Sequence, residues 1–162
     1  MTIYVIFGIF LAIVCYITAS GYIMRARESE FNMRRRELLD LYVKRANLMP
    51  IFLAAARHMS PIPGDLYNRF LNAREVFAKA TPRTNLNDAN AELNAVFDKF
   101  FAHYAACREP LYIKTREDYD ALQEKINFTS SFYQLALTRY HQAQSSPLRH
   151  GARLVRVLID RT

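Results

Sequence analysis

The sequence predicts an all-α membrane protein: a single N-terminal transmembrane helix, then an antiparallel four-helix bundle and a short basic C-terminal helix. Three observations lead to this prediction. The first residues form an apolar segment without a charged side chain until Arg25. Apolar residues then recur at alternating steps of three and four, which is the spacing of one helix face. The 162 residues include only four Gly and six Pro, which favours long helices over a fold rich in turns.

The segment Ile3–Ile23 has the length and composition of a transmembrane helix. A helix needs about 20 apolar residues to cross roughly 30 Å of hydrocarbon. Tyr4 and Tyr22 stand near its two ends, about 27 Å apart along a helix, so both rings can lie at headgroup level. A cleaved secretory signal is the alternative, but such a signal has basic residues before a shorter apolar core. We therefore expect residues 1–24 to be an anchor that stays in the chain.

Positive charge is concentrated directly after this segment. No Lys or Arg precedes it, and the arginines that follow it are Arg25, Arg27, Arg34, Arg35 and Arg36. The positive-inside rule then places the N-terminus outside and the rest of the chain in the cytoplasm. We expect these arginines, together with Tyr4 and Tyr22, to face the lipid headgroups.

Four amphipathic runs follow and predict a four-helix bundle. Their predicted core positions are Leu39, Tyr42, Ala46, Met49, Leu53 and Ala56 in the first run and Leu66, Phe70, Ala73, Phe77 and Ala80 in the second. Those of the third run are Leu86, Ala89, Leu93, Val96, Phe100, Tyr104 and Cys107, and those of the fourth are Tyr119, Leu122, Ile126, Thr129, Tyr133, Ala136, Tyr140 and Ala143. Short stretches that contain Pro separate the runs, and short links favour helices that run up and down beside one another. We assign residues 25–144 to this bundle.

Local signals predict where these helices begin and end. Pro50 lacks a backbone donor, so it should kink the first helix or restart it near residues 48 and 49. Asn85 or Asn87 is the expected N-cap of the third helix. Thr115–Asp118 has the spacing of a capping box, which predicts that the fourth helix begins there.

The net charge of +7 lies mainly at the two ends of the part that follows the anchor. The basic stretches are residues 25–36 and 149–161, and an even number of antiparallel helices brings both to the end of the bundle that faces the bilayer. Each Lys or Arg near an anionic leaflet contributes about 1 kcal/mol. Residues 145–162 are expected to form a basic amphipathic helix on this leaflet; the alternative is a helix that caps the bundle or binds a partner. The arginines directed at the headgroups would be Arg149, Arg153 and Arg156.

Three patches occur in order after the anchor: KRANLMP (Lys44–Pro50), AREVFAKA (Ala73–Ala80) with a following AN-x-x-L, and LYIKTREDYDALQEKINFTSSFYQLALTRYHQA (Leu111–Ala143). Together they resemble the LemA family of bacterial membrane proteins, as a divergent member in which TSSF (Thr129–Phe132) replaces the family's Thr-Glu-Asn run. The resemblance implies a helical bundle on one N-terminal anchor in the bacterial inner membrane, a cytoplasmic domain, and no established enzymatic activity. Some members are tied to the organisation of intracellular membrane compartments.

The sequence contains no catalytic constellation. The four His are far apart, no Cys-x-x-Cys occurs, and the four Gly are isolated, so the usual metal-ligand and phosphate-loop patterns are missing. Cys15 and Cys107 are expected to be free thiols. We expect no enzyme activity, no catalytic residue, no cofactor, no metal and no small-molecule substrate. Anionic lipid accounts for the basic ends more simply than nucleic acid does.

Tyr and Phe are dense in two stretches, 97–104 and 127–133. One interpretation is a broad apolar stripe in the core, and the other is an exposed aromatic surface for another protein. The expected partner-contacting residues are Phe101, Phe128 and Phe132. We expect a non-enzymatic scaffold or accessory subunit of a larger inner-membrane assembly, in contact with other membrane-protein subunits or with itself. The alternatives are a self-assembling protein that organises or remodels membranes, and a regulatory partner of a membrane protease.

Overall fold

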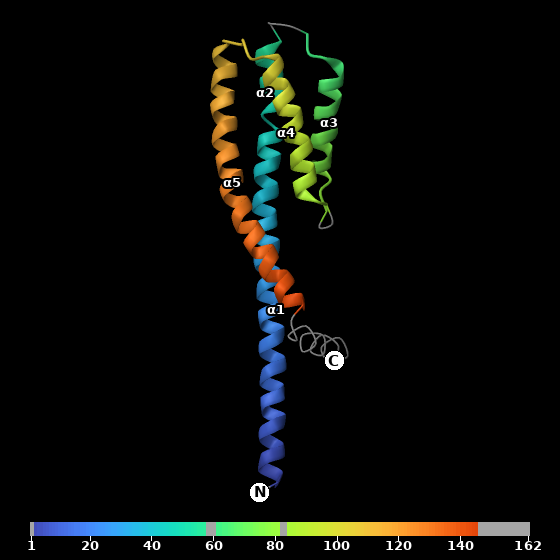
Figure 1. Ribbon diagram of the computed structural model, residues 1–162, viewed down its shortest axis with the longest axis vertical. Coiled ribbons are helices and arrows are strands. Elements are labelled where there is room, and N and C mark those ends of the chain that lie inside the picture. The colour runs from blue at the N-terminus through green and yellow to red at the C-terminus, as the bar shows by residue number, and fades with distance from the viewer. Residues whose placement is uncertain (1, 58–60, 82–83, 146–162) are drawn as a thin grey trace. The chain divides into compact units, whose positions relative to one another are not determined.

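The computed structural model describes residues 2–57, 61–81 and 84–145, and it confirms the all-α class (Figure 1). These residues form α1 (Thr2–Ala46), α2 (Met49–Ala56), α3 (Gly64–Ala78), α4 (Leu86–His103) and α5 (Pro110–Ser145), and none of them belongs to a strand. The expected C-terminal helix of residues 145–162, with Arg149, Arg153 and Arg156, lies outside the described residues apart from Ser145.

The chain divides into two compact units. The core unit is Arg36–Ser130, and the anchor unit is formed by residues 1–35 together with 131–162. Both α1 and α5 contribute to each unit, since the divisions fall within these two helices. The units are described separately below.

An aromatic cluster holds the core unit together. Phe52 of α2 lies at its centre, and its side chain is fully buried. The Phe52 ring contacts five others, with centroids 5.3–6.4 Å apart: Phe97, Phe100 and Phe101 of α4, and Tyr112 and Tyr119 of α5. Tilted and edge-to-face pairs of this kind add about 0.5–1.5 kcal/mol each beyond the apolar area that they bury. The cluster therefore ties α2, α4 and α5 to one another.

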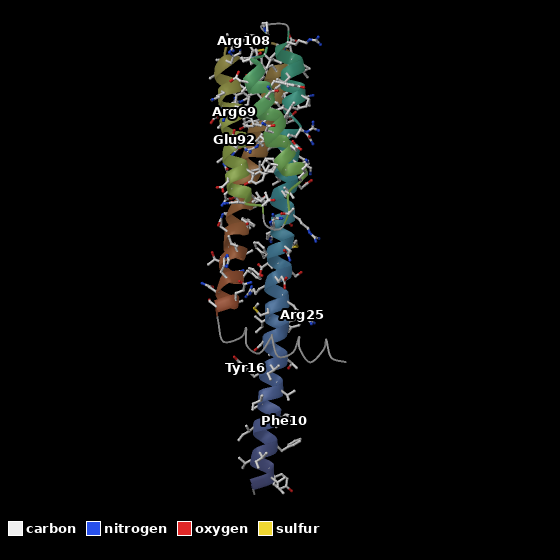
Figure 2. All side chains as sticks on the ribbon, turned by 90° about the vertical axis from the view of Figure 1, so that its right-hand side faces the viewer. Phe10, Tyr16, Arg25, Arg69, Glu92 and Arg108 are labelled. Atoms are coloured by element: carbon white, nitrogen blue, oxygen red, sulfur yellow. The ribbon has the colours of Figure 1, made fainter. Side chains whose placement is uncertain are left out.

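Helix α3 joins this core on its apolar face. Leu66, Phe70, Ala73 and Phe77 are buried, as the spacing predicts, and the Phe77 ring lies 5.4 Å from that of Tyr42 in α1. On the surface between α3 and α4, Arg69 and Glu92 form an ion pair at 2.8 Å (Figure 2). This pair is exposed and contributes little, so α3 is held mainly by its buried side chains.

The predicted core positions of the third run are confirmed. All seven of them are buried: Leu86, Ala89, Leu93, Val96, Phe100, Tyr104 and Cys107. In the first run, two predicted core residues, Leu39 and Leu53, are only half-buried. The residue before each of them, Leu38 and Phe52, is fully buried instead. The run is two helices rather than one. Leu38 and Leu39 lie four and three positions before Tyr42, and Phe52 and Leu53 lie three and four after Met49, so the spacing of a helix face fits either member of each pair.

Pro50 produces the predicted break, since α1 ends at Ala46 and α2 begins at Met49. Pro50 lies in the first turn of α2, where a missing N–H leaves no helical hydrogen bond unmade. Asn85 is confirmed as the N-cap of α4: its backbone is extended, and its Oδ1 accepts a hydrogen bond from the Asn87 N–H at 3.0 Å.

The predicted capping box at Thr115–Asp118 is wrong. Helix α5 already begins at Pro110, a residue whose fixed φ suits the first turn of a helix. Thr115 is buried inside the helix, and its hydroxyl donates to the Leu111 carbonyl oxygen at 2.7 Å. A Thr within a helix makes this local bond as readily as it caps one, so the spacing alone misplaced the start by more than a turn.

The central place of Phe52 gives a stability prediction. Phe52→Ala should lower the free energy of unfolding by about 3–5 kcal/mol, because it removes a ring with five aromatic contacts and leaves a cavity. Urea denaturation of the detergent-solubilised chain, followed by circular dichroism, measures the change. Phe128→Ala makes the same substitution at a ring that is 68% exposed, and it should cost less than about 1 kcal/mol. Equal losses from the two variants would contradict the assigned core.

Candidate functional site

The first functional feature is the apolar surface of α1. Residues Ile3–Ile23 expose most of their large apolar side chains, and only 6% of the most apolar stretch is buried. Phe10 and Tyr16 extend away from the helix in Figure 2. A buried core helix would show the opposite pattern, and contiguous apolar patches larger than a few hundred Å² are rare on soluble monomers. The chain therefore has one described helix that is long and apolar enough to cross a membrane.

The aliphatic hydroxyls in this stretch, those of Thr18 and Ser20, suit an apolar solvent. Thr18 Oγ1 donates to the carbonyl oxygens of Val14 and Cys15, each at 3.0 Å, and Ser20 Oγ donates to the Tyr16 carbonyl at 2.7 Å. Each of these two hydroxyls thus donates to a carbonyl of its own helix. Hydrocarbon offers no other acceptor, whereas water would.

The residues expected at the membrane interface differ in exposure. Tyr4 and Tyr22 are 82% and 77% exposed, one near each end of the span. Arg25 and Arg36 are also exposed. Arg27 is half-buried and pairs with Glu30 at 3.0 Å.

Two further arginines of this group are less accessible. The Arg34 guanidinium lies over the Phe132 ring, 5.5 Å from its centroid. Arg35 is buried, with 8% of its surface exposed. The guanidinium groups that are open to a headgroup are therefore chiefly those of Arg25 and Arg36, in the anchor unit and the core unit respectively.

In the anchor unit, the last part of α5 packs along α1. The Phe31 ring stacks on Tyr140, with centroids 5.1 Å apart and planes 7° from parallel, and it also contacts Tyr133 at 5.7 Å. Arg139 donates to Glu30 at 3.4 Å. Because Arg34 meets Phe132 while Glu30 meets Arg139, the two helices run in opposite directions. The end of α5 therefore approaches the part of α1 that directly follows the apolar span (Figure 1).

The core unit contains a buried polar centre, formed by Arg45 of α1, Asn90 of α4 and Gln123 of α5. Arg45 has no exposed surface, its Nη1 donates to Gln123 Oε1, and its Nη2 donates to Asn90 Oδ1. The guanidinium lies 5.6–6.0 Å from the ring centroids of Tyr42, Phe97 and Tyr119. Among the described residues, no carboxylate forms an ion pair with Arg45.

Burial dominates the electrostatics of this centre. Desolvation lowers the pKa of Arg45 from its ordinary value, while Tyr119, Tyr42 and Asp98 act in the opposite direction. An arginine begins from so high a pKa that it stays charged at neutral pH. Desolvation also disfavours the charged form of Tyr119, and for this acidic group it raises the pKa, so the phenol stays neutral. A buried cation is costly, and here two neutral amides and three aromatic rings offset part of the cost, while Arg45 Nε has no hydrogen-bond partner among the described residues.

Sequence reasoning missed the polar centre. In the sequence Arg45 stands out only as part of the KRANLMP patch, although it lies between Tyr42 and Ala46, two buried residues of α1. The signal in the sequence is a charged residue three positions after Tyr42, at the spacing of the apolar face, together with amides such as Asn90 and Gln123 beside the apolar positions of other runs. Only the folded arrangement shows that these three residues meet, since they are 45 and 78 positions apart.

The expected partner-contacting residues lie in different surroundings. Phe101 is half-buried in the aromatic cluster, with the Arg116 guanidinium 3.6 Å from its centroid. Phe128, in the core unit, is largely exposed. Phe132, in the anchor unit, is 39% exposed beside Arg34. Phe128 is thus the most accessible of the three.

Within the described ranges, no three His, Cys, Asp or Glu side chains gather in a way that could hold a metal ion. Comparisons with protein-family models, with curated proteins and with solved structures found no match to this chain.

The polar centre gives a second stability prediction. Asn90→Leu should lower the free energy of unfolding by about 1–3 kcal/mol, because it takes an acceptor from a buried charge. Arg45→Met, which keeps much of the volume without the charge, should cost less than Arg45→Ala. In the double variant Arg45→Met/Asn90→Leu, the second change should cost far less than it does alone. Urea unfolding of the four variants tests this coupling.

Arg74→Met is the matched control, because Arg74 is an exposed arginine of α3, and it should leave stability within about 0.5 kcal/mol. Additive losses for Arg45→Met and Asn90→Leu would show that the polar centre is not a coupled unit.

Proposed function

We propose that this chain is a single-span protein of the bacterial inner membrane, and that its helical domain is a non-enzymatic scaffold or accessory subunit of a larger assembly. The observation that carries the proposal is the exposed apolar length of Ile3–Ile23, followed by a basic stretch and then by a packed helical unit. Lipid covers such a surface, and the helical unit is then held beside the membrane.

Charge supports a cytoplasmic location for the helical domain. Lys and Arg are abundant within the 20 or so residues after the span, where they count most in the positive-inside rule. The exposed guanidinium of Arg25 has few competing protein contacts and is well placed for an anionic headgroup.

The core unit fits an antiparallel four-helix bundle, in which α1 with α2, α3, α4 and α5 form the four members. Phe52 joins α2, α4 and α5, and the pair Tyr42–Phe77 joins α1 to α3. The Arg45 guanidinium lies near both Tyr42 and Phe97, which connects the two sets and supports this arrangement. The direction of α5 in the anchor unit supports a basic tail at the membrane, since it carries the chain back to the segment beside the span.

The role of scaffold or accessory subunit rests on what the described residues provide. They provide an apolar helix of membrane-spanning length, an aromatic core and exposed apolar side chains such as Phe128 that a partner could cover. The resemblance to the LemA family points the same way and remains a prediction.

Orientation can be tested with a single cysteine. In a background of Cys15→Ser and Cys107→Ala, Met33→Cys places a thiol at an exposed position after the span. A membrane-impermeant maleimide should leave it unlabelled in intact spheroplasts and label it once the membrane is permeabilised. A native cytoplasmic thiol protein serves as the control for leakage. Labelling of Met33→Cys before permeabilisation would reverse the proposed topology.

The accessory role can be tested by purification from the native membrane in mild detergent, followed by native mass spectrometry. Foreign subunits in fixed stoichiometry are the expected result. A ladder of homo-oligomers would instead support self-assembly and membrane remodelling, and a membrane protease as the bound subunit would support the regulatory alternative. A chain that is monomeric in every gentle detergent tried would contradict the accessory role.

A further inference from the structure

A groove of about 390 Å³ lies in the core unit, where α4 ends and α5 begins. Its walls combine aromatic and aliphatic side chains, Phe101, Tyr112 and Ile113, with the two cations Arg108 and Arg116. This volume is within the usual range for ligand sites, which runs from roughly 300 to 1,000 Å³.

The backbone around the groove is held in place. After α4 ends, the Tyr104 N–H donates to the Phe100 carbonyl at 3.0 Å and the Cys107 N–H to the Tyr104 carbonyl at 2.9 Å. Tyr104 and Cys107 are each only 2% exposed, so this link is fixed to the core from inside. This link carries Arg108, an exposed residue whose Nη1 donates to the Cys107 carbonyl at 3.4 Å.

Arg116 is positioned by the aromatic floor. Its guanidinium lies 3.6 Å from the Phe101 centroid and 5.5 Å from that of Tyr119. Its Nε donates to Asp120 at 3.3 Å, and no hydrogen bond of its two Nη atoms occurs within the described residues. The side chain is 40% exposed, so these donors can reach a ligand. A guanidinium fork of this kind binds a carboxylate in a planar, two-bond geometry.

The other residues that line the groove determine which chemical group of the ligand fits beside its carboxylate. Ile113 is 44% exposed and, with Phe101 and Tyr112, gives an apolar surface directly beside the cations. Glu117 also lines the groove and leaves its two arginines with one net positive charge, which suits a single carboxylate rather than two. The combination suits one acidic group with a large apolar neighbour.

We propose that this groove binds an acidic–apolar segment of a partner protein, with the carboxylate at Arg116 and Arg108 and the apolar side chain against Ile113 and Tyr112. The proposal rests on the accessory role stated above and names the chemistry of the partner. It also gives Phe101 a defined part in partner binding, as the platform that holds Arg116 in place.

An array of hexapeptides tests this proposal with the full chain in detergent. Each peptide carries a central Asp, Asn or Lys next to a Leu, Phe or Ser. Peptides with Asp beside Leu or Phe should bind best, and their Asn counterparts should bind about 10-fold more weakly, since the charge-assisted bonds are lost. No binding to any peptide, or binding that does not depend on the acid, would overturn the proposal.

Substitutions locate the binding site. Arg116→Gln should weaken the best peptides about 10-fold, and Arg74→Gln, a matched change on α3 away from the groove, should not. Because Arg116 packs on Phe101, circular dichroism checks the fold of the variant. Arg108→Gln, at an exposed position, should also weaken binding and provides a second reading if Arg116→Gln unfolds. Unchanged binding in both groove variants would overturn the proposal.

Two further measurements separate the alternatives. Glycerol 1-phosphate, a soluble lipid headgroup, tests whether the groove binds lipid headgroups: binding that is lost in Arg116→Gln, without peptide binding by the native chain, would overturn the proposal. The two proposals can fail separately. Native complexes that contain only copies of this chain would contradict the accessory role, and a peptide array without acid-dependent binding would contradict the groove proposal.

Discussion

The apolar surface of Ile3–Ile23 is the constraint on which the rest of the structure depends. Most of its large apolar side chains are exposed, and the helix is long and apolar enough to cross a membrane. The hydroxyls of Thr18 and Ser20 fit an apolar solvent, because each is bonded to a carbonyl of its own helix. Once this segment lies in lipid, the basic stretch after it lies at one membrane surface, and the pairing of α5 with α1 brings the end of α5 to the same segment.

The core unit combines two kinds of interaction with different consequences. The rings around Phe52 supply non-directional attraction, which many similar packings could satisfy. The bonds from Arg45 to Asn90 and Gln123 are directional, and they are made only in one alignment of α1, α4 and α5. A misaligned core would leave a cation buried without acceptors, which is far more costly than an imperfect apolar contact. We infer that the polar centre fixes which of the possible packings is adopted.

Local features of the sequence predicted much of the fold. The apolar positions of Leu86–Cys107, the N-cap at Asn85 and the break before Pro50 each depend on a few neighbouring residues, and the structure has all of them. The start of α5 was misplaced because Thr115 bonds within a helix as well as at its cap. The polar centre and the groove beside Phe101 could not be predicted, since each joins residues from different helices, and the pattern along one helix does not show its neighbours.

The proposed function follows from this division of roles: a retained span fixes the location, and the helical unit offers rigid surfaces to a partner. Its most direct test is the intact mass of the protein that stays in membranes after alkaline carbonate extraction. The account predicts that this species contains Ile3–Ile23 and remains in the membrane pellet. A mature chain that begins after Gly21 and appears in the soluble fraction would contradict it.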